Sequence, residues 1–522
     1  MRVEGSKGGA RLRRSVPLFA AGVAFSTVFF APSRAHALEP EVTSDTTAQF
    51  YDVRSPTGET VLSRRRLTTT LGVSTYDLLG AEQATPADGR LQPELSFRAR
   101  MRYDADYGAD PNEAAPNAPN SVVPGFSRGP VDLMYGYVEG RRFAKGWLGF
   151  KLGRQYTTDA LGWWSFDGGE VRVTTPLYFS VEAYGGLEVR GGLPLSTPRF
   201  QSDGMWRGDR TGYDPSLYTA FQPNDIAPAI GLAIETAGFS WLHGRLTYRR
   251  VYNTGSSNVS MFASGLTAPV TYDGTRVSSE RVGYSVDGNL AQVGGVRGGF
   301  AWDMYNAKMA SIYASLDAYA GQKLTLSLDY DYYAPTYDAD SIWNFFMGEP
   351  MNDLGARASY SLSDSVSMAG GVHGRIFQTQ TDVTSSTASP NITAANNPSD
   401  YPTNGASFDG GFDVSIRQKA GENQNGVRGS GNFGQEGDRA GGELFFDRVL
   451  YDRYLAGGRM SVYQWNDKLR PDRDATSFGA VASIGYKVAK RTRVRFDQEM
   501  NVNRIVGAGF RSMIWLTVAV NP

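Results

Sequence analysis

The stretch KLTLSLDYDY (Lys323–Tyr332) alternates between polar residues and leucines or tyrosines without a break. Successive side chains of a β-strand point to opposite faces. Leu326 and Leu328 therefore lie on one face of a predicted strand, and Asp329 and Asp331 lie on the other. A period of two indicates a strand with one apolar face and one hydrated face.

The same alternation recurs along most of the chain. It covers Glu94–Tyr103, Leu177–Arg190, Arg491–Val502 and Phe510–Val520. Strands of soluble proteins usually span about 5–6 residues, whereas these runs of about 10–14 residues have the length of tilted strands that cross a membrane. Their apolar faces also carry Ala and Gly, which lipid tolerates and a packed core would leave hollow. The sequence therefore predicts an all-β fold, a single transmembrane antiparallel β-barrel, with a secreted soluble β protein as the alternative.

Two kinds of connection separate the predicted strands. Short turns alternate with longer loops near residues 104–129, 190–227, 253–277, 334–352 and 378–405, which are rich in Pro, Asn, Asp, Ser and Gly. Outer-membrane barrels have this asymmetry, with short periplasmic turns and long external loops. Over residues 61–522 we predict a barrel of about 18 strands, with about 20 as the alternative, around a water-filled lumen. The weakest strand assignments lie at Asn425–Phe433 and near Leu67.

The first 60 residues lie outside the predicted barrel. Arg11, Arg13 and Arg14 precede an apolar stretch at Val16–Phe30, and a small-x-small cleavage site ends at Ala37. Residues 1–37 are therefore predicted to be a secretory signal peptide, and residues 38–60 a short periplasmic segment. No later apolar run has the length of a spanning helix. Together with the barrel pattern, this predicts a location in the outer membrane of a Gram-negative bacterium.

The composition excludes several classes of function. The chain has 522 residues and a net charge of −1, from 52 Lys and Arg against 53 Asp and Glu. A nucleic-acid-binding protein normally carries a basic excess. The absence of Cys rules out disulfides, thiolate metal sites and thiol catalysis, and 3 His leave little for other metal sites. No nucleophile motif or metal-spaced His pair accompanies His243 or His373. We predict no enzyme activity, no cofactor and no metal.

The faces opposite the apolar stripes are expected to line the channel. The last strands must pair with the first, because an open edge would leave backbone groups unsatisfied in lipid. This closure predicts a basic wall made of Arg64, Arg66, Arg98, Arg100, Arg102, Arg491, Arg493, Arg495 and Arg511. Further charged lumen candidates are Arg245, Arg249, Arg375, Glu182, Asp329, Asp331, Asp497 and Glu499. Such a wall favours anions in a wide pore, unless the arginines pair with neighbouring acids and only brace the barrel.

The loop over residues 190–227 is the longest and is the candidate to fold inward and narrow the lumen. It carries Trp206, Arg207, Arg210 and Asp214. Tryptophans near strand ends are expected in the aromatic girdles at the membrane interfaces, whereas Trp515 falls on the lumen face of the last strand. Most of these tryptophans are expected in the girdles, and the remainder are candidates to stack on sugar rings, which offer apolar C–H faces; the set is Trp147, Trp163, Trp164, Trp302, Trp343 and Trp465.

Two stretches carry a resemblance to a known family. Gly146–Gln155 (GWLGFKLGRQ) and Asp167–Arg172 (DGGEVR) resemble a segment of alginate-export-type outer-membrane barrels, where a Leu-Gly-Arg-Gln strand end precedes an Asp-Gly hairpin. They are also similar to the barrels of polysaccharide-export clusters in gliding soil bacteria, and Arg64–Thr68 fits the same pattern. The resemblance implies a barrel of about 18 strands whose Arg-rich lumen passes an anionic polymer. The chain departs from the pattern at Ala519–Pro522, which lacks the usual terminal Phe, and in its many lumen acids.

Three functions fit these features. The leading interpretation is a conduit for export of an anionic polysaccharide, working with a periplasmic export partner. The alternative is a passive porin for small hydrophilic solutes, and the third is a structural or adhesin barrel that acts through its external loops. Export predicts lumen aromatics and a basic path along the whole lumen, whereas a passive porin predicts opposed basic and acidic walls.

Overall fold

A computed structural model gives the fold. It describes residues 39–54, 60–76, 78–79, 92–106, 131–189, 226–255, 257–259, 270–336, 350–377, 407–435, 437–468 and 474–520. The predicted signal peptide lies outside these residues. No helix in the described ranges is long and apolar enough to cross a membrane.

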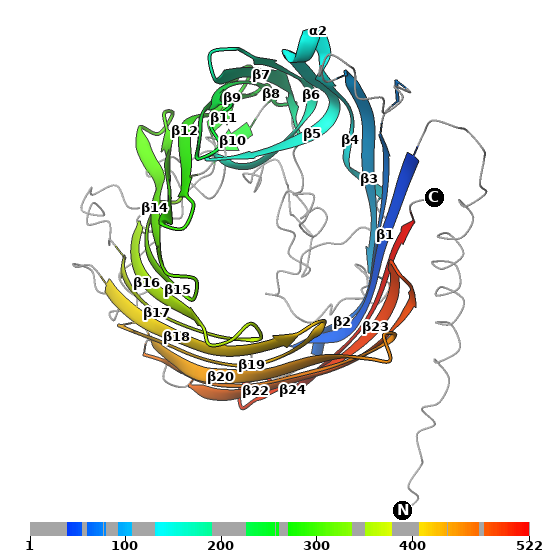
Figure 1. Cartoon of the computed structure of the whole chain (residues 1–522), viewed down its shortest axis with the longest axis vertical. Helices are drawn as coiled ribbons and strands as arrows, with labels where there is room; N and C mark the ends of the chain where they lie inside the picture. Colours follow the sequence, from blue (N-terminus) through cyan, green and yellow to red (C-terminus); the bar gives the residue numbers. More distant parts are fainter. Residues whose placement is uncertain are drawn as a thin grey trace, which may run out of the picture.

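Within the described residues, twenty-two antiparallel strands close into one barrel (Figure 1). Consecutive strands pair along the chain, except that β9 pairs with β12 across the separate hairpin β10–β11. The ring closes where β1 pairs with β24, from Val42 opposite Val520 to Tyr51 opposite Arg511. The strands are β1 (Glu39–Arg54), β2 (Thr60–Tyr76), β3 (Glu94–Asp106), β4 (Val131–Arg142), β5 (Leu148–Asp159), β6 (Gly162–Thr174), β7 (Phe179–Glu188), β8 (Pro228–Thr236), β9 (Leu242–Asn253), β10 (Ser257–Val259), β11 (Val270–Tyr272), β12 (Arg276–Leu290), β13 (Gly294–Asp303), β14 (Lys308–Ala320), β15 (Leu324–Tyr333), β16 (Met351–Ser361), β17 (Val366–Phe377), β18 (Ser407–Ala420), β19 (Asn423–Gly434), β20 (Gly437–Leu450), β21 (Tyr454–Asp467), β22 (Ala475–Ala489), β23 (Thr492–Asn503) and β24 (Gly507–Val520). One short helical turn, α2 (Phe143–Gly146), joins β4 to β5.

Strand register divides the side chains into an outer and an inner set. On β15, Leu326 and Leu328 are 45% and 50% exposed. They lie opposite Ala358 and Ala356 of β16, which share their face. Apolar side chains that are this exposed around a closed ring fit a lipid environment, because they have no hydrogen-bonding groups that would need water. Asp329 and Asp331 occupy the opposite, inner face.

The two rims of the barrel differ. All five long connections predicted from the sequence join strands at one rim, called here the loop rim. The opposite turn rim carries short connections apart from residues 77–93, and the ends of β1 and β24 also lie there. Exposed aromatic side chains gather at the turn rim, including Trp147, Tyr178 and Trp241 at 53%, 57% and 52% exposure. This is the position of an interfacial girdle.

The predicted count of about 18 strands is wrong, because the barrel has 22. Residues 39–54, within the predicted periplasmic segment 38–60, form β1 and pair with both β2 and β24. Between Val42 and Phe50, the outer face of β1 carries only Ser44, Thr46 and Ala48, so its middle lacks the bulky apolar residues that mark other strands. The Gly- and Asn-rich segment at Asn425–Phe433 is also a strand, within β19. Small residues hid these strands from the sequence pattern.

One sector of the wall folds inward and packs on itself. Figure 1 shows the cyan strands β5 and β6 curving across to the green strands β9 and β12. At the tip of the β5–β6 hairpin, Leu161 is buried with Ala301 of β13 and Ala310 of β14. Its carbonyl accepts a hydrogen bond of 3.2 Å from Arg249 Nη2 of β9. Gly283 of β12 makes room for this contact, since a Cβ there would lie 2.8 Å from Leu161 Cδ2.

The folded sector, formed by β5 to β9 and β12 and called here the side lobe, has a packed interior. Trp164, Phe166, Tyr184 and Val251 belong to one buried cluster, and the rings of Trp164 and Phe166 stack with centroids 4.4 Å apart. At this cluster, the inner faces of these strands therefore meet protein rather than the main lumen. The remaining strands surround that main lumen.

Candidate functional site

Closure of the barrel brings the predicted basic wall together. Arg64 and Arg66 lie on β2, Arg98, Arg100 and Arg102 on β3, Arg493 and Arg495 on β23, and Arg511 on β24. These strands are neighbours through β1, and register places the arginines on the inner face. Arg491 instead lies in the turn before β23, where its carbonyl accepts the Ala519 N–H at 3.1 Å.

Acidic side chains compensate much of this wall. Arg66 forms an ion pair with the buried Asp104. Arg100 pairs with Asp45 at 2.8 Å and Arg102 with Asp132 at 3.3 Å. These carboxylates belong to β1, β3 and β4, so the acids are interleaved with the arginines.

The same holds on the strands across the closure. Arg495 pairs with Asp497 at 2.6 Å, and Arg511 lies 3.9 Å from Glu499. Trp515 faces the lumen as expected, because its Nε1–H donates to Asp497 at 2.8 Å. Asp497 and Glu499 are therefore partners of the basic wall rather than separate selectivity charges.

An acidic strip faces the lumen on β14 to β16, made of Asp317, Asp329, Asp331 and Asp353. Asp331 lies directly opposite Asp353 in the register of β15 and β16. Asp317 has Arg297 at 3.4 Å and Asp353 has Arg375 at 2.5 Å. Within the described part of the chain, neither Asp329 nor Asp331 forms an ion pair. Figure 1 shows β14 to β16 on one side of the main lumen and β1 to β3 on the other, so the strip and the basic wall face each other.

Arg245, Arg249 and Glu182 were expected to line the lumen but belong to the interior of the side lobe. Arg245 pairs with Glu182 at 2.6 Å and with Glu235 at 3.0 Å, and the three side chains are 12%, 7% and 15% exposed. Arg249 lies over the Trp164 ring, 4.9 Å from its centroid. Parity along a strand is the same for a side chain facing water and for one facing the folded wall, so the sequence did not separate the two cases.

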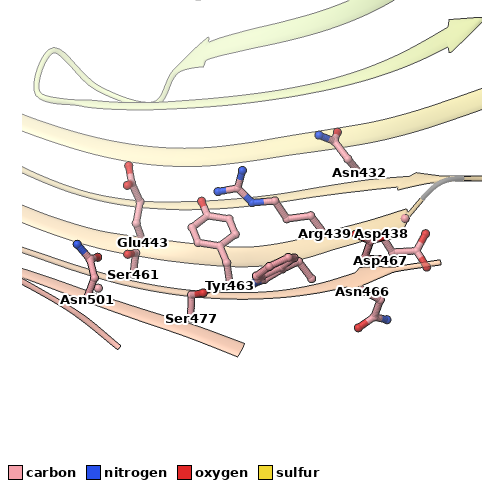
Figure 2. Close-up of a pocket in the computed structure, with 13 residues that line it drawn as sticks. Asn432, Asp438, Arg439, Glu443, Ser461, Tyr463, Asn466, Asp467, Ser477 and Asn501 are labelled. Carbon is pink, nitrogen blue, oxygen red and sulfur yellow. Dashed lines mark hydrogen bonds between the residues drawn. The ribbon is translucent and has the colours of Figure 1, made fainter. Parts of the chain in front are cut away.

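The predicted inward loop with Trp206, Arg207, Arg210 and Asp214 lies outside the described residues. Sequence reasoning also missed a group of inner side chains on β19 to β23 (Figure 2). It includes Trp465, one of the tryptophans of which most were expected in the girdles. The available signal was its parity with Ser461 and Tyr463 on β21, which shows that Trp465 points inward. Among the described residues, no group of His, Cys, Asp and Glu is arranged to hold a metal ion.

Comparison with known proteins finds only distant structural similarity. No family model matches the chain, and no curated protein matches it. OccAB4 of Acinetobacter baumannii has a TM-score of 0.42 at 7% identity, over 94% of this chain and 100% of that one. The BenF-like porin from Pseudomonas fluorescens Pf-5 has a TM-score of 0.42 at 8% identity, with 94% and 100% covered. The translocation pore of the P pilus usher PapC has 0.42 at 7%, with 92% and 100% covered.

None of these three is an alginate exporter, and similarity this low says nothing about the solute of this chain. The wall of the barrel itself indicates where the protein is located. A closed ring satisfies the backbone hydrogen bonds, and apolar side chains cover the outer face. Only helices and closed barrels meet that requirement in lipid, so the protein is a β-barrel of the outer membrane.

Proposed function

We propose that this barrel is a passive outer-membrane channel for small hydrophilic solutes. The observation that carries the proposal is the distribution of charge on the inner wall. The basic wall is interleaved with acids, and an acidic strip faces it across the main lumen. Opposed charges of both signs suit a pore that admits solutes without holding one sign of polymer.

The width of the ring supports a hydrated passage. Strands spaced about 4.8 Å apart and tilted by about 40° would give a circular ring of 22 strands a diameter of about 44 Å. The side lobe takes up part of that width. Barrels of 16 or more strands are too wide for inward side chains to fill.

The same wall argues against export of a polyanion as the main function. A polyanion needs a continuous basic path, whereas five of the predicted arginines lie beside acids and β14 to β16 present four carboxylates. The lumen aromatics that export would use do occur, at Tyr463, Trp465 and Trp515. Aromatic residues alone select no charge, so they fit a porin equally well.

Liposome swelling tests the proposal. Vesicles containing the purified full chain are expected to swell in arabinose, glucose and maltose. The swelling rate should fall as the solute becomes larger, because larger solutes diffuse more slowly through a water-filled pore. Vesicles without protein are the control. Swelling rates equal to that control for all three sugars would contradict the proposal.

A further inference from the structure

A cavity of about 840 Å³ opens on the inner face of β19 to β23, near the loop rim (Figure 2). Strand register builds its wall in rows. Asn432, Arg439 and Trp465 lie opposite one another on β19, β20 and β21. One row deeper, Tyr463 lies opposite Ser477 of β22. The volume is within the range of small-molecule sites, and neither the basic wall nor the acidic strip contributes to it.

Two aromatic rings in this cavity are held in fixed positions. Trp465 Nε1–H donates to Ser477 Oγ at 3.2 Å, so the indole is anchored at one edge. The Arg439 guanidinium lies over the Tyr463 ring, 4.5 Å from its centroid. Gly441 lies beneath that ring, since a Cβ there would come within 2.6 Å of Tyr463 Cδ1. Rings fixed before a ligand arrives lose little freedom on binding.

Polar groups surround the two rings, and a space remains open beside two of these polar groups, Ser461 and Asn501. A Cβ at Gly479 would meet Ser461 Oγ at 2.8 Å and Asn501 Oδ1 at 3.0 Å, so the bare glycine keeps a space open beside both groups. Glu443 lies opposite Ser461, and in the described part of the chain it has no ion-pair partner within 4.0 Å. Hydroxyl, amide, guanidinium and carboxylate groups therefore line one small volume.

We infer that this cavity is a binding subsite for a neutral sugar on its way through the channel. The inference rests on the proposed function, since it names the class of solute that the pore would take. A sugar ring presents an apolar C–H face, which packs on an aromatic ring, and a rim of hydroxyls that both donate and accept. Arg439 would repel a cation, and Glu443 together with Asp438 and Asp467 of the same lining would repel an anion, whereas the hydroxyl groups of a neutral sugar both donate and accept hydrogen bonds.

Calorimetric titration of maltotriose into the detergent-purified full chain tests this inference. The Trp465→Ala variant is expected to bind about tenfold more weakly, the factor that corresponds to 1.4 kcal/mol of lost contact. Trp465→Phe keeps a ring and is expected to recover part of the loss. Trp302→Ala is the matched control, because Trp302 lies on the outer face in register with Val282. Asn501→Ala tests the polar side with the aromatic rings intact and is expected to weaken binding too.

Trigalacturonate, an anionic trisaccharide, separates a neutral-sugar subsite from an anion site. We expect it to bind more weakly than maltotriose. Tighter binding of trigalacturonate, equal binding by Trp465→Ala and Trp302→Ala, or no maltotriose binding would each overturn the inference. Conductance in a planar bilayer, recorded on the same preparation, separates failure of the subsite from failure of the proposed function. A conducting pore without sugar binding would contradict the subsite alone, whereas a protein without conductance would contradict the proposed function.

Discussion

Replacing Arg245 by methionine is expected to lower the free energy of unfolding by about 3–5 kcal/mol. The Arg245 guanidinium forms ion pairs with Glu182 and Glu235, whose side chains are only 7% and 15% exposed. Without it, Glu182 is a buried carboxylate with no ion-pair partner among the described residues, and an uncompensated buried charge costs far more than a lost surface contact. Denaturant unfolding of the protein in detergent, followed by the shift of the folded band on a gel, measures the change.

Two further variants separate the side lobe from a general effect of losing arginine. Arg245→Met combined with Glu182→Leu removes the stranded charge and should recover most of the stability, while Glu235 keeps Arg172 at 3.0 Å. Arg357→Met breaks the ion pair between Arg357 and Asp413, whose side chains are 48% and 24% exposed. It should lower the free energy of unfolding by only about 0–1 kcal/mol. Equal losses for Arg245→Met and Arg357→Met would show that the lobe is not packed as described.

Neutralising the acidic strip is expected to give the largest change in ion selectivity. In the Asp329→Asn and Asp331→Asn double variant, two carboxylates that have no ion-pair partner among the residues that the structure describes lose their charge, so the main lumen becomes more permeable to anions. We expect a several-fold rise in the anion-to-cation permeability ratio at about 10 mM salt, where the Debye length is about 30 Å. At about 1 M salt the length is about 3 Å and the change should nearly vanish. The reversal potential in a salt gradient reports it.

Glu280→Gln is the matched control for this variant. Glu280 lies opposite Arg250 on the outer face of β12 and accepts a hydrogen bond from Tyr248 at 2.7 Å. Removing its charge leaves the lumen unchanged, so the reversal potential should stay at the wild-type value. A shift of the same size in both variants, or no shift in the double variant at low salt, would exclude the strip as a selectivity element.

The alternation of the sequence was enough to predict the barrel and the face on which most side chains lie. Asp329 and Asp331 were placed in the lumen by Leu326 and Leu328 alone, and the register of β15 agrees. The strand count failed where that signal was weak. In the middle of their outer faces, β1 presents serine, threonine and alanine and β19 presents glycine where other strands present leucine or valine, and hydrogen bonds to their neighbours decide their pairing.

The candidate site was less accessible from the sequence, for a different physical reason. The side lobe depends on contacts between distant strands, such as Leu161 with Ala301 and Arg249 with Trp164. Likewise, whether an arginine is a free charge depends on which strand lies beside it. Asp45 of β1 reaches Arg100 of β3 because both strands pair with β2, one on each side of it. Periodicity reports the face of a residue but not its neighbours.

The most direct test of the passive-channel proposal is the single-channel current of the purified barrel in a planar bilayer with a salt gradient, before and after addition of alginate. We predict a steady open conductance with weak ion selectivity that alginate leaves unchanged, because acids compensate the basic wall and a second acidic surface faces it. A closed or strongly anion-selective pore that alginate blocks would contradict the passive channel and return the export of an anionic polysaccharide to first place.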